Sequence, residues 1–295
     1  MTLITDSRYE HLLRTRAHNP ELIAEKATLR KRRPLLGADG NVVIVAIDHP
    51  ARRILKVGTD PWAMADRREV LERTVRALRR PGVDGVLATP DIAEDLLLLD
   101  ELDEKVVFGS MNRGGITGST WELSDRITGY NPAGIERAGW EGGKMLLRLD
   151  YDDPGTETTM QECVAGINGL ADRSLIALIE PLPARHINGK VSVVIEMDAV
   201  VEAVAVASAL GNTTAYTWLK LPTVADPERM MAATTLPSLL LGGDPGERAA
   251  DLLASWRAAL SIPHVRGLVA GRSLLFPADG QVERWVDAAV EIVHG

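Results

Sequence analysis

Short apolar runs alternate with longer amphipathic stretches along almost the whole chain. Eight of these runs are rich in Val, Ile and Leu, and a stretch of helical periodicity follows each one. The predicted strands cover residues 41–47, 83–89, 105–111, 144–149, 174–182, 215–221, 237–243 and 266–271. The predicted helices cover residues 65–79, 91–99, 156–172, 197–210, 246–260 and 281–293, and two more begin at Asn131-Pro132 and Asp226-Pro227.

Continuous apolar strands, each followed by a helix, are typical of a parallel sheet with helices on its outside. Eight such units in about 250 residues predict an α/β fold of the TIM (β/α)8 barrel type. An open doubly wound sheet is the alternative, but it needs a Gly-rich first turn, and the turn AIDHPARR has no glycine. Residues 1–40 predict an N-terminal helical extension over the N-terminal end of a barrel formed by residues 41–295.

Composition narrows the possible partners. The chain has 295 residues, of which 45% are hydrophobic, as in an ordinary globular enzyme. Its net charge of −8 argues against nucleic-acid binding, because phosphate backbones attract an excess of Lys and Arg. We interpret the basic run from Arg30 to Arg33 as a solvated helix end. No apolar run approaches the roughly 18 residues of a membrane span, so we expect no membrane contact either.

Cysteine usage and the first residues indicate the compartment. A single cysteine, Cys163, excludes an intramolecular disulfide. Met1 is followed by Thr-Leu-Ile-Thr-Asp rather than by a basic and then apolar leader. We therefore expect a cytoplasmic protein.

One predicted strand carries a residue that its neighbours do not favour. Lys220 stands among Trp218, Leu219, Leu221 and Pro222, where an ammonium group is costly to bury without a partner. Either Lys220 reaches the edge of the strand, or the chain needs an amine at this place.

Polar residues stand at the ends of most predicted strands, on the rim where TIM barrels collect their active sites. The candidates, in strand order, are Asp48, His49, Asn112, Arg113, Lys144, Arg148, Glu180, Lys220, Gly242, Gly243, Gly271 and Arg272. Side chains alternate along a strand, so Lys144 and Arg148 share one face. That face must be the barrel interior if Lys144 is catalytic.

The candidates also have simpler interpretations. A lysine at a strand start is usually a solvated cap, and that is the first interpretation of Lys144 taken alone. Glu180 could be an ion-pair partner at the rim, and Asp48 before His49-Pro50 could begin a turn. These simpler interpretations are harder to accept for all the residues at once. Two lysines, two carboxylates and two glycine turns fall on one predicted rim.

Schiff-base catalysis accounts for these residues as a group. A lysine amine attacks a ketone only when unprotonated, and an apolar pocket or a nearby cation favours that form. Lys220 has the pocket and Lys144 would be the cation. Asp48 and Glu180 would move a proton on and off the substrate hydroxyl. The glycine turns after the last two strands would bind a phosphate through backbone N–H groups.

Several segments resemble the class I aldolases of the tagatose-bisphosphate and bacterial or archaeal-type fructose-bisphosphate group. They are VAIDHPARR, KMLLRLDYDDPG, ALIEPL, WLKLP, LLLGGDP and LVAGRSLL, which occur in the family's order between residues 41 and 275. Inositol-catabolism and deoxyribose-phosphate aldolases are further relatives in this superfamily.

The resemblance implies a carbon-carbon lyase and assigns roles. It implies Lys220 as the imine-forming residue, and Asp48, Lys144 and Glu180 as proton-handling or positioning groups. The phosphate site would comprise Gly242, Gly243, Gly271 and Arg272, with Arg148 also contacting substrate. Arg148 stands where tagatose-type members carry tyrosine, and residues 110–131 depart from the family pattern. Both departures weigh against a bisphosphate and favour a deoxy-keto-gluconate phosphate or another ketose phosphate.

Two other functions stay open at this point. A metal-dependent aldolase or isomerase would need several histidines or carboxylates around one ion, and of six histidines only His49 and His186 lie near the predicted rim. A non-catalytic barrel that binds a sugar phosphate is the other. We expect a phosphorylated sugar as partner, no cofactor, no metal ion, and association into homo-oligomers.

Overall fold

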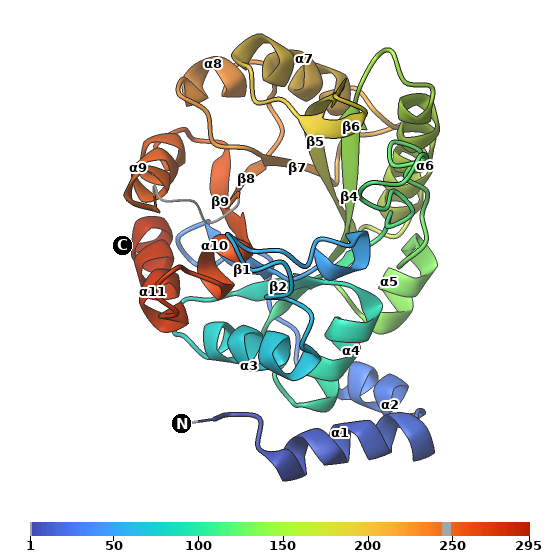
Figure 1. Cartoon of the computed structure of the whole chain (residues 1–295), viewed down its shortest axis with the longest axis vertical. Helices are drawn as coiled ribbons and strands as arrows, with labels where there is room; N and C mark the ends of the chain where they lie inside the picture. Colours follow the sequence, from blue (N-terminus) through green and yellow to red (C-terminus); the bar gives the residue numbers. More distant parts are fainter. Residues whose placement is uncertain (1, 244–248) are drawn as a thin grey trace.

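The computed structural model, which describes residues 2–243 and 249–295, is a closed barrel of parallel strands within a ring of helices (Figure 1). In these residues eight strands pair in the order β4-β3-β2-β1-β9-β8-β7-β5, and pairing of β5 with β4 closes the ring. The predicted TIM (β/α)8 barrel is therefore confirmed. Its strands are β1 Val42–Ala46, β2 Gly85–Ala88, β3 Val106–Ser110, β4 Gly142–Leu149, β5 Ile176–Ile187, β7 Thr217–Leu221, β8 Ser238–Leu241 and β9 Val265–Ala270.

Helices follow the strands around the outside, and in the described part of the chain all except the short η1 and α10 lie close to predicted places. They are η1 Pro50–Arg52, α3 Arg67–Leu78, α4 Pro90–Leu98, α5 Pro132–Ala138, α6 Gly155–Ala171, α7 Met197–Ser208, α8 Pro227–Met231, α9 Ala249–Leu260, α10 Arg272–Leu275 and α11 Val282–His294. Cap residues set several starts: the side chain of Asn131 accepts a 2.8 Å hydrogen bond from Gly134 N, and Pro132 fills the first turn. The predicted start of α9 at Gly246 lies outside the described residues.

Alternation along the strands divides the apolar side chains between two cores. Val43 and Val45 of β1 face the helices, whereas Val42, Ile44 and Ala46 face the barrel interior. The interior cluster also contains Leu87, Val106, Phe108, Leu178, Trp218, Leu239 and Val269. The barrel is therefore filled below its C-terminal end, and any site must lie above this layer.

The N-terminal end of the barrel is covered differently from the prediction. Helices α1 (Asp6–His18) and α2 (Leu22–Leu29) lie to the side of the barrel, outside α4 (Figure 1). Arg16 on α1 donates to Asp95 on α4 at 2.6 Å. The irregular segment after α2 supplies the cover, because Leu35 and Leu36, which lie at bends, pack against the interior cluster. The expectation of a helical cover was wrong, since two leucines outside any helix pack against the interior cluster.

The interpretation of the run from Arg30 to Arg33 as a solvated helix end is wrong for Arg30. Its side chain is buried, lies over the ring of Trp140 and pairs with Glu141 at 2.8 Å. The other oxygen of Glu141 accepts from Val107 N at 2.7 Å. Arg30 thus joins the N-terminal segment to the start of β3.

A hairpin that the sequence analysis missed rises from the C-terminal end of the barrel. Strand β5 continues past the predicted end at residue 182 and pairs antiparallel with β6 (Lys190–Val193). Asn188 and Gly189 form the turn with φ values of 52° and 74°.

None of the described helices has the length and apolar character that a membrane span needs.

Candidate active site

A cavity of about 510 Å³ opens at the C-terminal end of the barrel. The nine predicted residues with an assigned role all line it, from six different strands or the turns after them: Asp48, Lys144, Arg148, Glu180, Lys220, Gly242, Gly243, Gly271 and Arg272. Of the other three rim candidates, His49 and Arg113 also line the cavity, whereas Asn112 does not. Apolar side chains from the β5–β6 hairpin, Val191 and Val193, form part of its wall. The structure therefore brings the predicted residues together in one place, while their chemical roles remain predictions.

Strand periodicity explains why the polar side chains point into this cavity. Trp218 and Leu178 belong to the barrel interior, so Lys220 and Glu180, each two residues further along, face the same way. Asp48 follows Ala46 with the same spacing. The polar residues thus form the layer directly above the apolar filling of the barrel.

Glu180 lies between the two lysines. Its Oε1 atom is 2.9 Å from Lys220 Nζ, and its Oε2 atom contacts Lys144 Nζ. All three side chains are buried, so Lys144 is not a solvated strand cap. Burial alone would raise the pKa of Glu180, but Lys144 and Lys220 lower it to about 2. Burial also lowers the pKa of Lys144, against the opposing effect of Asp48 and Glu180.

Asp48 is held as an anion on the other side of Lys144. Its Oδ2 atom accepts from Ser110 Oγ at 2.9 Å and from Arg113 Nη1 at 2.8 Å, and lies 3.4 Å from Lys144 Nζ. Burial would raise the pKa of Asp48, but Arg113 and Lys144 hold it well below its usual value. A continuous chain of charges therefore runs from Arg113 through Asp48, Lys144 and Glu180 to Lys220.

His49 lines the cavity beside this chain. Burial lowers the pKa of its imidazole to about 3, and Arg272 and Lys220 act in the same direction, so the ring is neutral near pH 7. Its Nδ1 atom is buried and finds no hydrogen-bond partner among the described residues. His49 thus offers the cavity a neutral ring close to Asp48.

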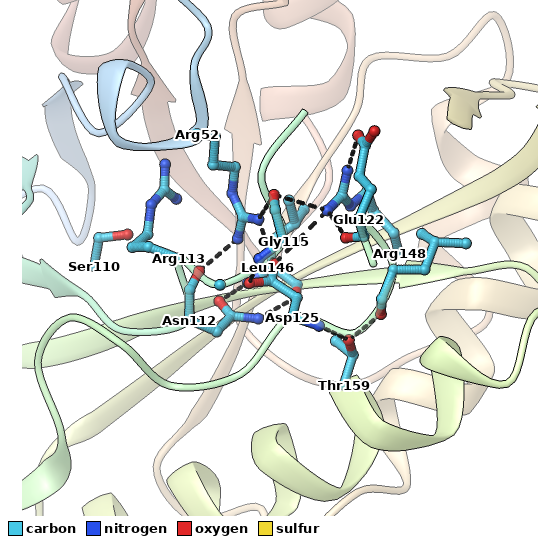
Figure 2. A network of polar contacts seen from close by, with 12 residues as sticks. Arg52, Ser110, Asn112, Arg113, Gly115, Glu122, Asp125, Leu146, Arg148 and Thr159 are labelled. Atoms are coloured by element: carbon cyan, nitrogen blue, oxygen red, sulfur yellow. Dashed lines mark hydrogen bonds and ion pairs between the residues drawn. The ribbon is translucent and has the colours of Figure 1, made fainter. Parts of the chain in front are cut away.

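Two buried arginines hold the long loop between β3 and α5 against the barrel (Figure 2). Arg52 donates to the carbonyl oxygens of Asn112 at 2.5 Å and Gly115 at 2.9 Å, and pairs with Asp125. Arg148 donates to Glu122 Oε1 at 2.5 Å and to the Glu122 carbonyl oxygen at the same distance. Residues 110–131, which depart from the family pattern, thus form one wall of the cavity. Thr117 and Glu122 are among the residues of this wall that line the cavity.

The glycine turns after β8 and β9 lie close together on the other side. A Cβ atom on Gly242 would approach Ser273 Oγ to 2.3 Å, and one on Gly271 would approach Ala46 O to 2.5 Å. Ser273 Oγ is buried and has no hydrogen-bond partner in the described part of the chain. These close approaches explain glycine at both positions, and both glycines line the cavity.

Sequence reasoning did not assign roles to several residues of the site. Arg113, Glu122 and Asp125 lie outside the segments that carry the resemblance, and His49 and Arg52 lie in VAIDHPARR without an assigned role. The contacts of these residues join distant segments of the chain. The only sequence signal for Arg113 and His49 was their position at predicted strand ends on the rim.

Within residues 2–243 and 249–295, no group of three or more His, Cys, Asp or Glu side chains is placed to hold a metal ion.

Comparison with known proteins places the chain in a family. A family model described as Cgl0159-like matches residues 40–290. The chain belongs to the Cgl0159-like family. The crystal structure of Cgl0159 from Corynebacterium glutamicum is 47% identical, with a TM-score of 0.97, and the match covers 100% of this chain and 99% of that one. No curated protein matches the chain.

Structures of archaeal fructose 1,6-bisphosphate aldolases share the fold at low identity. One is 19% identical with a TM-score of 0.66, and the match covers 92% of this chain and 98% of that one. In another, the catalytic Lys is covalently bound to the carbinolamine intermediate of the substrate. It is 18% identical with a TM-score of 0.65, over 92% of this chain and 100% of that one. The resemblance to class I aldolases is therefore confirmed for the fold.

Proposed function

We propose that this protein is a class I aldolase that makes or breaks a carbon-carbon bond through a Schiff base on Lys220. The substrate is a phosphorylated keto sugar or keto acid of carbohydrate catabolism, of the deoxy-keto-gluconate phosphate or ketose phosphate type. The observation that carries the proposal is a buried lysine that faces the cavity with a carboxylate 2.9 Å from its nitrogen. The shared fold with Schiff-base aldolases supports it.

Imine formation uses Lys220 and Glu180. Glu180 accepts a proton from the Lys220 ammonium, and the free amine attacks the ketone carbon of the substrate. The same carboxylate returns that proton to the carbinolamine hydroxyl, which leaves as water. The products are a protonated imine and one water molecule, so atoms and charge balance against the starting ammonium and ketone. The contact between Glu180 and Lys220 fits this short proton transfer.

Bond cleavage uses the other carboxylate. Asp48 takes the proton from the hydroxyl on the carbon gamma to the imine nitrogen. The electrons of the neighbouring carbon-carbon bond then flow into the imine, so an aldehyde leaves and an enamine remains. Protonation of the enamine and hydrolysis restore Lys220. Lys144 lies between Asp48 and Glu180 and keeps both carboxylates ionised and in position.

The glycine turns after β8 and β9 bind the phosphate in this proposal. Gly242, Gly243, Gly271 and Arg272 line the same cavity as Lys220. Backbone N–H groups and a guanidinium suit a phosphate, and the corresponding loops of TIM barrels are a frequent phosphate site.

A screen of phosphorylated keto sugars and keto acids for release of a three-carbon fragment tests the function. We expect one substrate to be cleaved by the wild-type protein and by the Lys56→Met control, whose lysine is exposed outside the cavity. Lys220→Met should lose cleavage by at least about a thousandfold and keep affinity for the phosphate. Normal turnover by Lys220→Met would refute the proposal. Loss of wild-type turnover on chelation would favour the metal-dependent alternative, and binding without any turnover would favour the sugar-phosphate binder.

A further inference from the structure

The topology of the barrel fixes which strand ends face each other across the cavity. Around the ring the order is β1, β2, β3, β4, β5, β7, β8, β9. In a closed ring of eight strands, β3 therefore lies opposite β8, and β4 opposite β9. The loop after β3 and Arg148 at the end of β4 thus stand across the cavity from the glycine turns proposed to bind phosphate.

That opposite wall carries a carboxylate. Glu122 is buried and lines the cavity, with Oε1 on Arg148 and Oε2 accepting from Gly118 N at 2.7 Å. Arg148, the cation beside it, already donates to Glu122 and to the Gly115 carbonyl oxygen at 3.3 Å. The positive charge of Arg148 is therefore balanced within the wall itself.

The second arginine near this wall is balanced in the same way. Arg52 pairs with Asp125, which in turn accepts from Gly115 N at 2.8 Å. Both acidic residues are buried, so their charges are weakly screened. A dianionic phosphate placed here would meet a carboxylate, and the terminal guanidinium nitrogens of Arg52 and Arg148 already contact carbonyl and carboxylate oxygens of the wall.

We propose that this site accepts substrates with a single phosphate, bound at the glycine turns, and that Glu122 rejects a second phosphate at the opposite end. This inference rests on the proposed aldolase function. The aldehyde fragment released or captured at that end is accordingly not phosphorylated. Of the two proposed substrate types this charge argument favours the ketose phosphate, because its aldehyde fragment is neutral, over a keto acid whose fragment ends in a carboxylate. The hydroxyl groups of a neutral fragment can donate to the Glu122 carboxylate and exchange hydrogen bonds with Thr117, which also lines the cavity. Glu122 is then a specificity-determining residue, because it penalises the wrong substrate through like charge.

Condensation of dihydroxyacetone phosphate with two matched acceptors tests the inference. D-Glyceraldehyde and D-glyceraldehyde 3-phosphate differ only in the phosphate at the far end. We expect the wild-type protein to use D-glyceraldehyde with a kcat/KM at least about tenfold above that for the phosphorylated acceptor. Equal use of both, or preference for the phosphorylated one, would overturn the inference without any variant.

A second experiment compares the same two acceptors with the Glu122→Gln variant. The change removes the charge and keeps an amide oxygen that can accept from Gly118. We expect the ratio of the two kcat/KM values to move by roughly tenfold or more toward the phosphorylated acceptor. A purely structural role would lower both values together and leave the ratio unchanged. Glu162→Gln is the matched control, because Glu162 contacts the same loop through Ile127 N but does not line the cavity.

The inference and the proposed function fail in different ways. Trapping of dihydroxyacetone phosphate on the protein with borohydride requires the imine but no acceptor. If the adduct forms while the ratio is unaffected by Glu122→Gln, only the specificity inference fails. If no adduct forms with dihydroxyacetone phosphate or with any other keto substrate of the screen, the aldolase proposal fails and the inference falls with it.

Discussion

Glu180 lies 2.9 Å from the nitrogen of Lys220 and at the same time contacts Lys144 through its other oxygen. One carboxylate therefore serves two buried ammonium groups. The arrangement keeps both lysines in the cavity and gives each a proton acceptor within hydrogen-bond reach. In the proposed mechanism Glu180 is therefore the residue on which both the stability of the site and its chemistry depend.

Glu180→Gln should impair folding and catalysis together. The two lysines would lose their shared counter-charge, and breaking a buried ion pair costs about 3–5 kcal/mol. Loss of a proton-transferring group lowers kcat by about 10²–10⁴-fold. Urea unfolding and steady-state kinetics measure the two effects. A variant with wild-type stability and turnover would show that the Glu180 contacts are unimportant.

The same carboxylate predicts a pH dependence of stability. The pKa of Glu180 is about 2 in the folded chain and about 4.3 in model peptides. Between these values the unfolded chain binds the proton and the folded chain does not, so stability falls as pH falls from about 4.3 toward 2. Wild type should lose more unfolding free energy than Glu180→Gln when the pH is lowered from 5 to 3. Equal losses would contradict the assignment.

Arg113 should determine the ionisation of Asp48. Arg113→Met removes the largest favourable charge acting on that buried carboxylate, so the pKa of Asp48 should rise. The acid limb of the kcat/KM profile then moves to higher pH, and the protein loses about 3–5 kcal/mol of stability. Arg113→Lys keeps the charge and should show smaller changes. Arg126→Met, at an exposed arginine, should change stability by less than about 0.5 kcal/mol. An unshifted acid limb in Arg113→Met would contradict this account.

His49 should stay neutral across the physiological range. Burial and the nearby cations hold its pKa at about 3, whereas an unfolded imidazole titrates near about 6.5. Stability should therefore fall as pH drops from about 6.5 toward 3, because only the unfolded chain takes up this proton. NMR of the ring protons, assigned with His49→Asn, should show no titration between pH 5 and 8. A midpoint near 6.5 would mean that the ring is solvated.

Gly271→Ala should disturb the proposed phosphate site. The new methyl carbon would lie 2.5 Å from Ala46 O and 2.6 Å from His49 Cε1, so the turn must move. Because small displacements of bound substrate are costly, kcat/KM should fall roughly ten- to a hundredfold. Gly280→Ala is the control: its φ of +69° makes alanine strained, but the site is remote. It should cost about 1 kcal/mol of stability and leave KM unchanged. Equal KM values in both variants would argue against the assigned turn.

Local signals made most of the barrel predictable. Each apolar run and the helix after it depends on neighbouring residues, and caps such as Asn131 with Pro132 mark the helix starts. The site residues were found because strand ends of a barrel converge. The hairpin at Asn188-Gly189 was missed, although an Asn-Gly pair is a recognised hairpin signal. The predicted strand ended at residue 182, whereas β5 continues through Pro183 to Ile187.

Contacts between distant segments were beyond the sequence. Arg52 and Asp125 are 73 positions apart, and neither stands in a pattern that indicates the other. The burial of Arg30 depends on Glu141 and Trp140, which approach it only when the N-terminal segment closes the barrel. Arg148 was expected to contact substrate; the structure also gives it the task of holding Glu122, and its contact with substrate remains a prediction.

Mass mapping of a borohydride-reduced adduct tests the central claim most directly. Incubation with the ketose phosphate found in the screen, or with dihydroxyacetone phosphate, should trap one adduct per chain. Digestion should place the adduct on the peptide that contains Lys220. Lys220→Met should abolish the adduct, whereas Lys144→Met should still form a measurable adduct on Lys220. An adduct on Lys144 alone, or no adduct under turnover conditions, would contradict Schiff-base catalysis at Lys220.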